Sequence, residues 1–460
     1  MQREVLTKQT VKMFIEDMIA PVQRHDPYAA FRVRGYRLYV WGWLISVMGA
    51  QIQGVAVGWE VYQRTGKALA LGLVGLAQAL PMIVLALPAG YVADAFDRRR
   101  VVMWSLLGTT ASSLGLAALS FTQGPITLMY GLLLIEATVS ALTRPARMAL
   151  VPQIVPRETF PSAVVWNSSL MQVGSVVGPA IGGFVVVMSV PAAYLLHAVC
   201  AVVFVVLLAR VELHEASRQA ERASAETLLA GLRFLRRTRL LLALMALDMF
   251  AVLLGGATYL LPVYAQDILH VGPQGFGWLR AAPGAGAFCM ALIVAHLPPM
   301  RRGGRNLLLA VAGFGAATIV FGLSTSFWLS LAMLFLTGAF DNVSMVVRGT
   351  LIQLLTPDAM RGRVSAVNGV FIGASNQLGG LESGLVAHWF GAVFSVVSGG
   401  IGTIVVVLVT ALASPRLRAV GALHEARLEG DPSTHSTSSG QAGPSTMLRT
   451  SSGQAAAGDS

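Results

Sequence analysis

The sequence predicts an all-α polytopic membrane protein, with twelve transmembrane helices arranged in two pseudo-symmetric bundles of six. Three observations support this fold class. First, 55% of the 460 residues are hydrophobic and only 12% are charged, whereas soluble domains carry roughly 25% charged residues. Second, thirty of the 33 Lys and Arg residues fall in every second gap between apolar stretches. Third, the two halves of the chain share sequence features at equivalent spans.

The alternation of basic residues predicts the number and the orientation of the spans. The gaps on one side hold 7, 3, 3, 7, 3, 3 and 4 basic residues, and the opposite gaps hold 2, 0, 0, 1, 0 and 0. Lys and Arg in short loops collect on the cytoplasmic side of a membrane, so we expect both termini in the cytoplasm. A span needs about 20 apolar residues, which predicts helices near 37–63, 68–94, 100–120, 125–147, 162–188, 191–211, 239–265, 274–298, 306–325, 327–350, 364–388 and 391–413.

The longest charged interruption divides the chain into two halves. It is helix-compatible from Ala225 to Leu235, with leucines at helical spacing, and we interpret it as a cytoplasmic linker with an amphipathic helix. The C-terminal end is rich in Ser, Thr, Gly and Ala, which predicts disorder from about residue 431. The expected units are a cytoplasmic lead-in 1–36, a first bundle 37–211, a linker 212–238, a second bundle 239–413 and a cytoplasmic tail 414–460.

The two halves resemble each other at spans 4–5 and 10–11. Each half has an Arg-x-x-Leu pair followed by a proline, and then a Gln-x-Gly. The matched residues are Arg147, Leu150, Pro156, Gln172 and Gly174 in the first half and Arg348, Leu351, Pro357, Gln377 and Gly379 in the second. Parallel halves are typical of transporters whose site lies between the repeats. The alternative is chance similarity among apolar helices.

The sequence does not contain the motifs that would indicate other classes of function. The net charge of +11 is spread over seven separate segments, so it does not indicate a nucleic-acid partner. The two cysteines, Cys200 and Cys289, both lie in spans and predict no disulfide. No phosphate-binding Gly-x-x-x-x-Gly-Lys-Ser/Thr loop, metal-ligand spacing or nucleophile elbow is present. We therefore expect no enzyme, no metal and no cofactor.

Residues 90–100 close span 2 and form a short loop with mechanistic potential. Gly90 allows close helix approach, and Asp94 stands where a carboxylate can cap a helix N-terminus or pair with a basic residue. The spacing resembles the Gly-x-x-x-Asp-Arg-x-Gly-Arg-Arg signature of the major facilitator superfamily, in which this loop is a conformational latch. Ala95 and Asp97 depart from that signature. The matching residues are Gly90, Asp94, Arg98 and Arg99. The alternative is a plain basic loop.

Span 5 carries small residues at regular spacing. Glycines four residues apart share one face and allow membrane helices to approach closely, and a proline kinks the helix. The set comprises Gly174, Gly178, Pro179, Gly182 and Gly183. It resembles the span-5 signature of major facilitator antiporters, which favours export. Generic tight packing is the alternative.

Ionisable residues inside spans are candidates for function, because burying a charge in lipid is costly. Glu136 lies in span 4, Asp248 in span 7, Asp341 in span 10 and Glu382 in span 11. The resemblance implies that spans 1, 4, 7 and 10 line a central cavity, which favours the first three as proton-coupling or cation-recognising carboxylates. Each could instead pair with an arginine or a helix end. Polar side chains that could line the cavity or tie helices together include Gln51, Asn167, Gln172 and Asn376, besides Gln53, Asn368 and Gln377.

Taken together, residues 30–415 resemble the major facilitator superfamily, nearest to the bacterial branch of enterobactin-exporter-like proteins and drug:proton antiporters. This resemblance implies alternating access and proton-coupled efflux of a small organic molecule, siderophore-like or drug-like. The implied partners are the lipid bilayer, the substrate and protons, with a monomeric chain in the bacterial cytoplasmic membrane. An importer or uniporter of the same fold, or a non-transporting receptor, remains the alternative.

Overall fold

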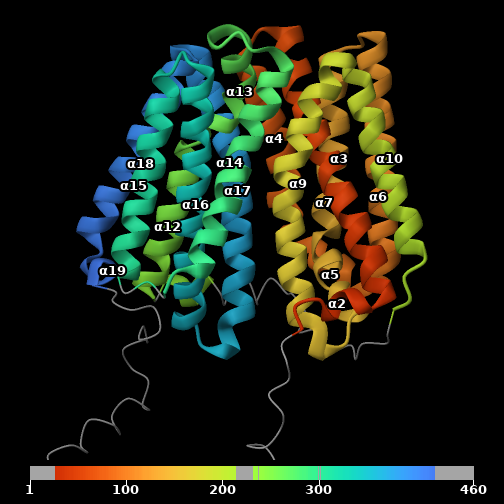
Figure 1. The fold of residues 1–460 in the computed structure, drawn as a ribbon, viewed down its shortest axis with the longest axis horizontal. Helices are drawn as coiled ribbons and strands as arrows, with labels where there is room; N and C mark the ends of the chain where they lie inside the picture. Colours follow the sequence, from red (N-terminus) through yellow and green to blue (C-terminus); the bar gives the residue numbers. More distant parts are fainter. Residues whose placement is uncertain (1–25, 214–231, 237, 299, 301, 420–460) are drawn as a thin grey trace, which may run out of the picture.

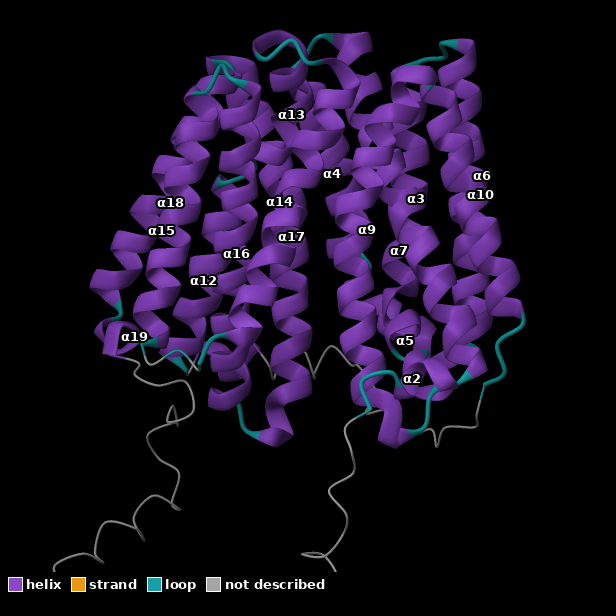
Figure 2. Cartoon of the chain, viewed as in Figure 1, coloured by secondary structure: helices purple, strands orange, loops and turns teal. Residues whose placement is uncertain are grey.

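The computed structural model describes residues 26–213, 232–236, 238–298, 300 and 302–419, and every regular element in them is a helix (Figures 1 and 2). Most of the predicted lead-in and linker lies outside these residues, as does the tail predicted to be disordered. Of the amphipathic helix predicted in the linker, residues 232–235 are described and are helical, and the rest lies outside. Ten of the described helices are long and apolar enough to cross a membrane. The shorter α4, continued by α5, and the 33-residue α17 complete the twelve predicted spans.

The first bundle contains spans 1 to 6. Its elements are α2 (Ala29–Arg32), α3 (Arg34–Thr65), α4 (Ala68–Val84), α5 (Ala86–Ala95), α6 (Arg98–Thr122), α7 (Ile126–Met148), α8 (Val151–Ile154), η1 (Arg157–Thr159), α9 (Phe160–Met188) and α10 (Val190–Ala209). Span 2 is divided between α4 and α5 at Leu85, one turn after Pro81. Proline lacks a backbone donor, which weakens the helix at this point.

The second bundle contains spans 7 to 12. Its elements are α12 (Arg239–Leu254), η2 (Ala257–Leu260), α13 (Leu261–Val263), η3 (Tyr264–Ile268), α14 (Gly272–His296), α15 (Gly303–Leu323), α16 (Phe327–Leu355), α17 (Asp358–Phe390), α18 (Ala392–Ala413) and α19 (Pro415–Ala419). In both bundles the helix ends lie within a few residues of the predicted boundaries.

Span 7 is broken, whereas the sequence predicted a continuous helix. The break falls at Gly255 and Gly256. The chain then continues as a 3₁₀ turn (η2), a short α-helix (α13) and a π-helical turn (η3). A Cβ on Gly256 would lie 2.6 Å from the Gly379 carbonyl oxygen of α17, and one on Gly399 of α18 would lie 2.0 Å from the Leu254 carbonyl. The backbones of three helices therefore meet at the break, where only glycine fits.

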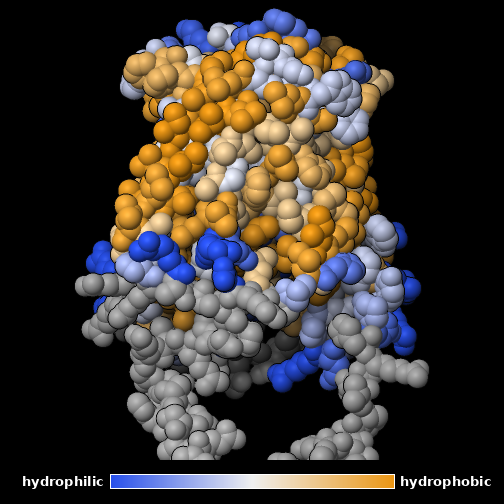
Figure 3. Space-filling view, turned by 60° about the vertical axis from the view of Figure 1, so that its left-hand side comes forward, coloured by the Kyte–Doolittle hydropathy of each residue, from blue (hydrophilic) through white to orange (hydrophobic). Residues whose placement is uncertain are grey.

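The two ends of the molecule differ in their basic residues: Arg98, Arg99 and Arg100 begin α6 at one end, whereas the connection from α6 to α7 at the other end has none. One end, here called the basic end, carries α2, α5 and α19, and the opposite far end carries α13 (Figure 1). Apolar residues cover the middle of the face in Figure 3, and hydrophilic residues gather at the basic end and more thinly at the far end. Large apolar side chains point outward, for example Trp104 and Leu412, which are 72% and 74% exposed. This outer surface suits a lipid environment.

The hydrophobic core has a different organisation at each end. At the far end, one cluster joins both bundles and includes Leu71 of α4 and Phe276 of α14. Toward the basic end there are two clusters, one confined to the first bundle around Phe204 and one confined to the second bundle around Leu351. The bundles are therefore packed together at the far end, and each has its own core at the basic end.

The span-5 glycines serve two different contacts. A Cβ on Gly174, Gly178 or Gly182 would lie about 3 Å from α3, within the same bundle. Gly183 faces the other bundle, because its Cβ would lie 2.9 Å from the Cα of Gly277 in α14. The motif thus combines packing inside the first bundle with one contact between the bundles.

A second glycine contact closes the opposite side of the interface. A Cβ on Gly384 of α17 would lie 2.7 Å from the Cα of Gly72 in α4. Both interfaces between the bundles, α9 with α14 and α4 with α17, therefore have a close glycine pair. These pairs lie in the turns near the far end, where the joint core cluster is found.

Candidate functional site

A cavity of about 270 Å³ lies between the bundles. Its walls come from α3, α4 and α7 of the first bundle and from α17 of the second. The lining residues are Ala50, Gln53, Gly54, Val57, Gln78, Met82, Leu133, Glu136, Ala137, Ser140, Ala141, Arg144 and Gln377. The mixture of polar groups with apolar wall is typical of a site for a small organic molecule.

One face of α7 supplies charge to the cavity. Glu136, Ser140 and Arg144 are spaced by four residues, so they lie one above another along the helix. Gln53 of α3 donates a hydrogen bond from Nε2 to the Glu136 Oε2 at 2.7 Å. The predicted candidate Glu136 is thus in the cavity wall, and its carboxylate is oriented by an amide from span 1.

A buried polar chain lies behind this carboxylate. The Gln53 Oε1 accepts hydrogen bonds from Ser113 Oγ at 2.8 Å and from His197 Nδ1 at 2.8 Å. His197 is 2% exposed, and this arrangement places its proton on Nδ1, since an amide oxygen only accepts. The chain therefore fixes the Gln53 amide so that its NH₂ group faces Glu136.

The second bundle contributes Gln377 to the cavity. Tyr259, which follows the break in span 7, donates a hydrogen bond from its hydroxyl to the Gln377 side-chain oxygen. The Tyr259 ring lies against Gly380, where a Cβ would be 2.7 Å away. The broken helix therefore positions a polar group of α17 at the cavity.

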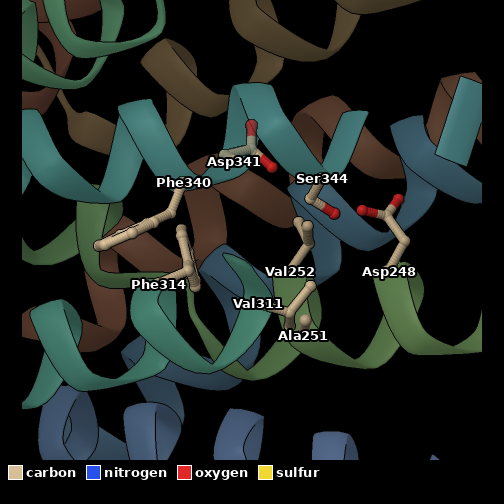
Figure 4. Close-up of a pocket in the computed structure, with 8 residues that line it drawn as sticks. All are labelled: Asp248, Ala251, Val252, Val311, Phe314, Phe340, Asp341 and Ser344. Carbon is tan, nitrogen blue, oxygen red and sulfur yellow. The ribbon is translucent and has the colours of Figure 1, made fainter. Parts of the chain in front are cut away.

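A narrower pocket lies within the second bundle (Figure 4). It is lined by Asp248, Ala251, Val252, Val311, Phe314, Phe340, Asp341 and Ser344. Its volume is about 10 Å³, which is room for about one water molecule. Figure 4 shows the Asp248 carboxylate and the Ser344 hydroxyl turned toward one another. This pocket suits a proton or a water molecule rather than an organic substrate.

The two predicted carboxylates in this pocket have different partners. Asp248 forms an ion pair with Arg348 of α16, and both side chains are less than 10% exposed. Asp341 makes no such pair among the described residues, although it lies within electrostatic range of Asp248 and Arg348. The sequence marked Arg348 only as a repeat position, because its partner lies 100 residues away.

Removing Arg348 should destabilise the protein. Arg348→Met leaves Asp248 buried without its cation, and breaking a buried pair costs several kcal/mol. Because Asp248 can take up a proton instead, we expect a loss of about 2 kcal/mol, seen as a lower midpoint of thermal unfolding in detergent. The double variant Asp248→Asn/Arg348→Met should recover most of that loss. Equal midpoints for Arg348→Met and the unmodified protein would contradict this role.

Three predicted polar residues lie at helix contacts outside both pockets. Gln51 faces α9, since a Cβ on Gly178 would lie 2.7 Å from its Cβ. Asn167 accepts a hydrogen bond from the Tyr36 hydroxyl at 3.2 Å. Gln172 donates to the Gly284 carbonyl oxygen at 2.7 Å and so links α9 to α14 across the bundle interface.

Two further candidates lie on α17 away from the pockets. Asn376 is exposed and donates to the Ile372 carbonyl oxygen of its own helix. Glu382 accepts a hydrogen bond from Ser383 at 3.3 Å. Gln377, which follows Asn376 in the sequence, lines the cavity instead. A side chain one position away points about 100° around a helix, so neighbours of similar chemistry cannot be told apart by composition.

The predicted latch loop makes contacts within the first bundle. Gly90 lies in α5, and the side chain of Asp94 lies outside the described part of the structure. The N-terminus of α6 is capped by Asp97, whose carboxylate accepts from the Arg100 amide at 2.8 Å. Asp97 departs from the signature, and it supplies the helix cap that the sequence suggested for Asp94.

Two latch arginines reach helix C-termini. Arg98 donates to the Ala149 carbonyl oxygen at 3.4 Å, and Arg99 donates to the carbonyl oxygen of Ala209. Cations at these ends are favoured by the helix dipole and by free carbonyl groups. The loop thus ties α6 to the ends of α7 and α10.

Arg280 is a candidate that charge counting missed. Arg280 is the one basic residue that the sequence count places in the gap after span 7. In the structure it lies inside α14. Its guanidinium lies beside Gly54 of the cavity wall, where a Cβ would be 2.9 Å from Nη2. An arginine flanked on both sides by apolar residues of a span was the signal available in the sequence.

Three solved structures with this architecture are transporters. A POT family transporter in complex with a thioalcohol-conjugated peptide aligns over 84% of this chain and 96% of its own, with a TM-score of 0.67 and 14% identity. A D-xylose–proton symporter gives a TM-score of 0.59 at 14% identity, covering 82% and 95%. A bacterial homologue of the human lysosomal transporter Spinster, inward-facing and occupied, gives 0.64 at 13%, covering 85% and 99%. The chain therefore shares the multi-pass helical fold of these transporters.

The family is shown by sequence comparison. A family model described as transmembrane secretion effector matches residues 25–438, and the chain belongs to this family. It is 29% identical over 346 residues to the enterobactin exporter EntS of Shigella boydii serotype 18, covering 73% of this chain and 82% of the relative. The enterobactin exporter EntS of Escherichia coli O157:H7 gives the same identity and coverage.

Proposed function

We propose that this protein exports a small organic molecule, siderophore-like or drug-like, across the bacterial cytoplasmic membrane in exchange for protons. The observation that carries the proposal is the pairing of two separate sites: the 270 Å³ cavity between the bundles and the water-sized carboxylate pocket inside the second bundle. The similarity to an enterobactin exporter and the antiporter-like glycines of span 5 support the direction.

The orientation follows from the positive-inside rule. In this proposal the basic end faces the cytoplasm, with both termini there, and the units are the lead-in, bundle, linker, bundle and tail predicted from the sequence. The joint core at the far end then closes the periplasmic side, and the separate cores toward the basic end correspond to a state that faces the cytoplasm. Export requires this state to load substrate, followed by rocking of the monomer's two bundles.

Proton coupling is assigned to the pocket of Asp248 and Asp341. Protonation must favour one facing state over the other, or no coupling follows. A proton on Asp341 removes a negative charge that competes with Asp248 for Arg348. Span 7 carries Asp248 and, beyond its break, Tyr259, which holds Gln377 at the cavity. The broken helix thus connects the proton pocket with the substrate cavity.

The proposal is tested in everted membrane vesicles energised to be acidic inside. A panel of siderophores and amphiphilic drugs is added, and the pH gradient is followed with a fluorescent dye. We expect at least one compound to dissipate the gradient and to accumulate in vesicles that contain the protein, with no effect in vesicles that lack it. Accumulation only in right-side-out vesicles, together with proton uptake, would favour the importer alternative. No proton movement with any transported compound would remove antiport.

A further inference from the structure

Arg280 is a cation about one third of the way along a membrane-spanning helix. It lies about 12 Å along α14 from the helix start. Among the described residues it has no ion pair, and its electrostatic neighbour is the Tyr259 phenol. Charges at such a depth cost free energy and, where they occur, face a partner or a water-filled cavity. Arg280 lies beside Gly54, a residue of the cavity wall, and has no carboxylate partner among the described residues.

The Arg280 guanidinium crosses from the second bundle to the first. It reaches Gly54 of α3, where the missing side chain leaves space for it. Gly54 and Gln53 belong to the wall of the substrate cavity, beside Glu136. The position of this cation is therefore defined by both bundles and borders the space where a substrate would bind.

Arg144 makes the reciprocal crossing. It lines the cavity from α7 of the first bundle, and a Cβ on Gly373 of α17 would lie 3.6 Å from its Nη1. Arg144 is exposed and also has no ion pair among the described residues. Each arginine thus extends from one bundle to a glycine of the other.

The acidic residues do not balance these two cations. Among the described residues that line the cavity, Glu136 is the one carboxylate, and its Oε2 already accepts from Gln53. The other buried carboxylates in the described ion pairs have their own arginines: Asp248 with Arg348, and Glu60 with Arg64. The cavity region therefore carries two guanidinium groups against a single carboxylate.

We propose that the cavity recognises an organic anion, through the guanidinium groups of Arg144 and Arg280. Guanidinium forks match carboxylate and phosphate oxygens with two parallel hydrogen bonds. An anionic group between the two bundles would also bridge them, since each bundle supplies one arginine. A cationic substrate would face net repulsion at this site. The inference rests on the proposed function, because it assigns the substrate class of the same cavity.

Binding to the purified full-length protein in detergent tests this proposal. The probes are dansylglycine and dansylglycinamide, which share a fluorophore and differ by one negative charge. We expect dansylglycine to bind at least ~10-fold more tightly, as charge-assisted hydrogen bonds predict. Arg280→Gln should reduce this preference to roughly 3-fold or less, and Arg280→Lys should retain part of it. Arg305→Gln, which removes an exposed charge from the start of α15, should leave the preference unchanged.

Two further measurements separate recognition from a structural role. Gly54→Ala keeps both charges but displaces the Arg280 guanidinium, so dansylglycine affinity should fall by roughly 2- to 5-fold. Arg280→Gln should not lower the midpoint of thermal unfolding, because it removes an unpaired charge from the membrane. A lower midpoint with an unchanged anion preference would make Arg280 a structural residue.

The outcomes distinguish this inference from the proposed export. Binding in detergent requires neither a proton gradient nor a direction of transport. If dansylglycine binds no more tightly than dansylglycinamide, or if neither binds, the anion proposal is overturned while vesicle export can still be observed. If dansylglycine is preferred and Arg280→Gln removes the preference, the inference holds even where the vesicles show no proton exchange.

Discussion

Replacing Asp341 with asparagine should reduce uphill export driven by a pH gradient by roughly 100-fold. Asp341 shares the water-sized pocket with Asp248 and lies within electrostatic range of Arg348. Asparagine is permanently neutral, so the pocket can no longer change charge with pH, and protons lose their differential effect on the two facing states. Downhill exchange of substrate needs no such effect and should continue.

Initial rates in proteoliposomes measure gradient-driven export when a pH gradient is present and downhill exchange when it is absent. Glu382→Gln is the matched control, since it neutralises a span carboxylate that lies in neither pocket, and it should keep gradient-driven transport. Asp341→Glu retains a titratable group and should restore part of the coupling. Gradient-driven accumulation at the unmodified rate in Asp341→Asn would assign coupling to another group, with Glu136 the next candidate.

Replacing Gly183 with leucine should prevent the far end from closing. A Cβ at this position would lie 2.8 Å from the Pro273 carbonyl oxygen and 2.9 Å from the Gly277 Cα, and backbone atoms cannot move aside as a flexible side chain can. Overpacking of this kind costs up to about 3 kcal/mol, which corresponds to a shift of roughly 100-fold between facing states. Transport should fall accordingly.

Distance measurements between spin labels on α9 and α14 near the far end can detect the shift. Gly183→Leu should populate longer distances than the unmodified protein. Gly131→Leu serves as the control, because a Cβ at Gly131 meets no atom within 4 Å. An unchanged distance distribution with normal transport would show that the far end tolerates the larger side chain and that this glycine pair is not needed for closure.

Much of the fold could be predicted because the membrane imposes simple rules on the sequence. Apolar stretches of about 20 residues identify spans wherever they occur, and helices such as α7 and α14 begin within two residues of their predicted starts. The break in span 7 could not be predicted. It depends on Gly379 and Gly399 approaching Gly256 and Leu254 from helices more than 100 residues away.

The candidate site was predicted in part. The resemblance implied that Glu136, Asp248 and Asp341 share one central cavity, but Glu136 lines the cavity between the bundles and the two aspartates line the narrower pocket inside the second bundle. Gln51 and Asn376 line neither pocket, although Gln53 and Gln377, which follow them by two residues and one residue, line the cavity. Depth along a span can be counted from its ends, whereas the direction of a side chain depends on the rotation of the helix, which packing with its neighbours sets.

The sequence by itself determined the fold class, the order of the spans and the separation of basic from neutral loops. These properties depend on local hydropathy and on charges near each span, which are readable without knowing any long-range contact. Only the tertiary structure decided that Asp248 is paired with Arg348 and that Gln53 orients Glu136. It also decided that Arg144 and Arg280, which have no ion pair among the described residues, approach the cavity wall from opposite bundles. Those relations join helices far apart in the chain, because the bundles, not the sequence order, bring their side chains together.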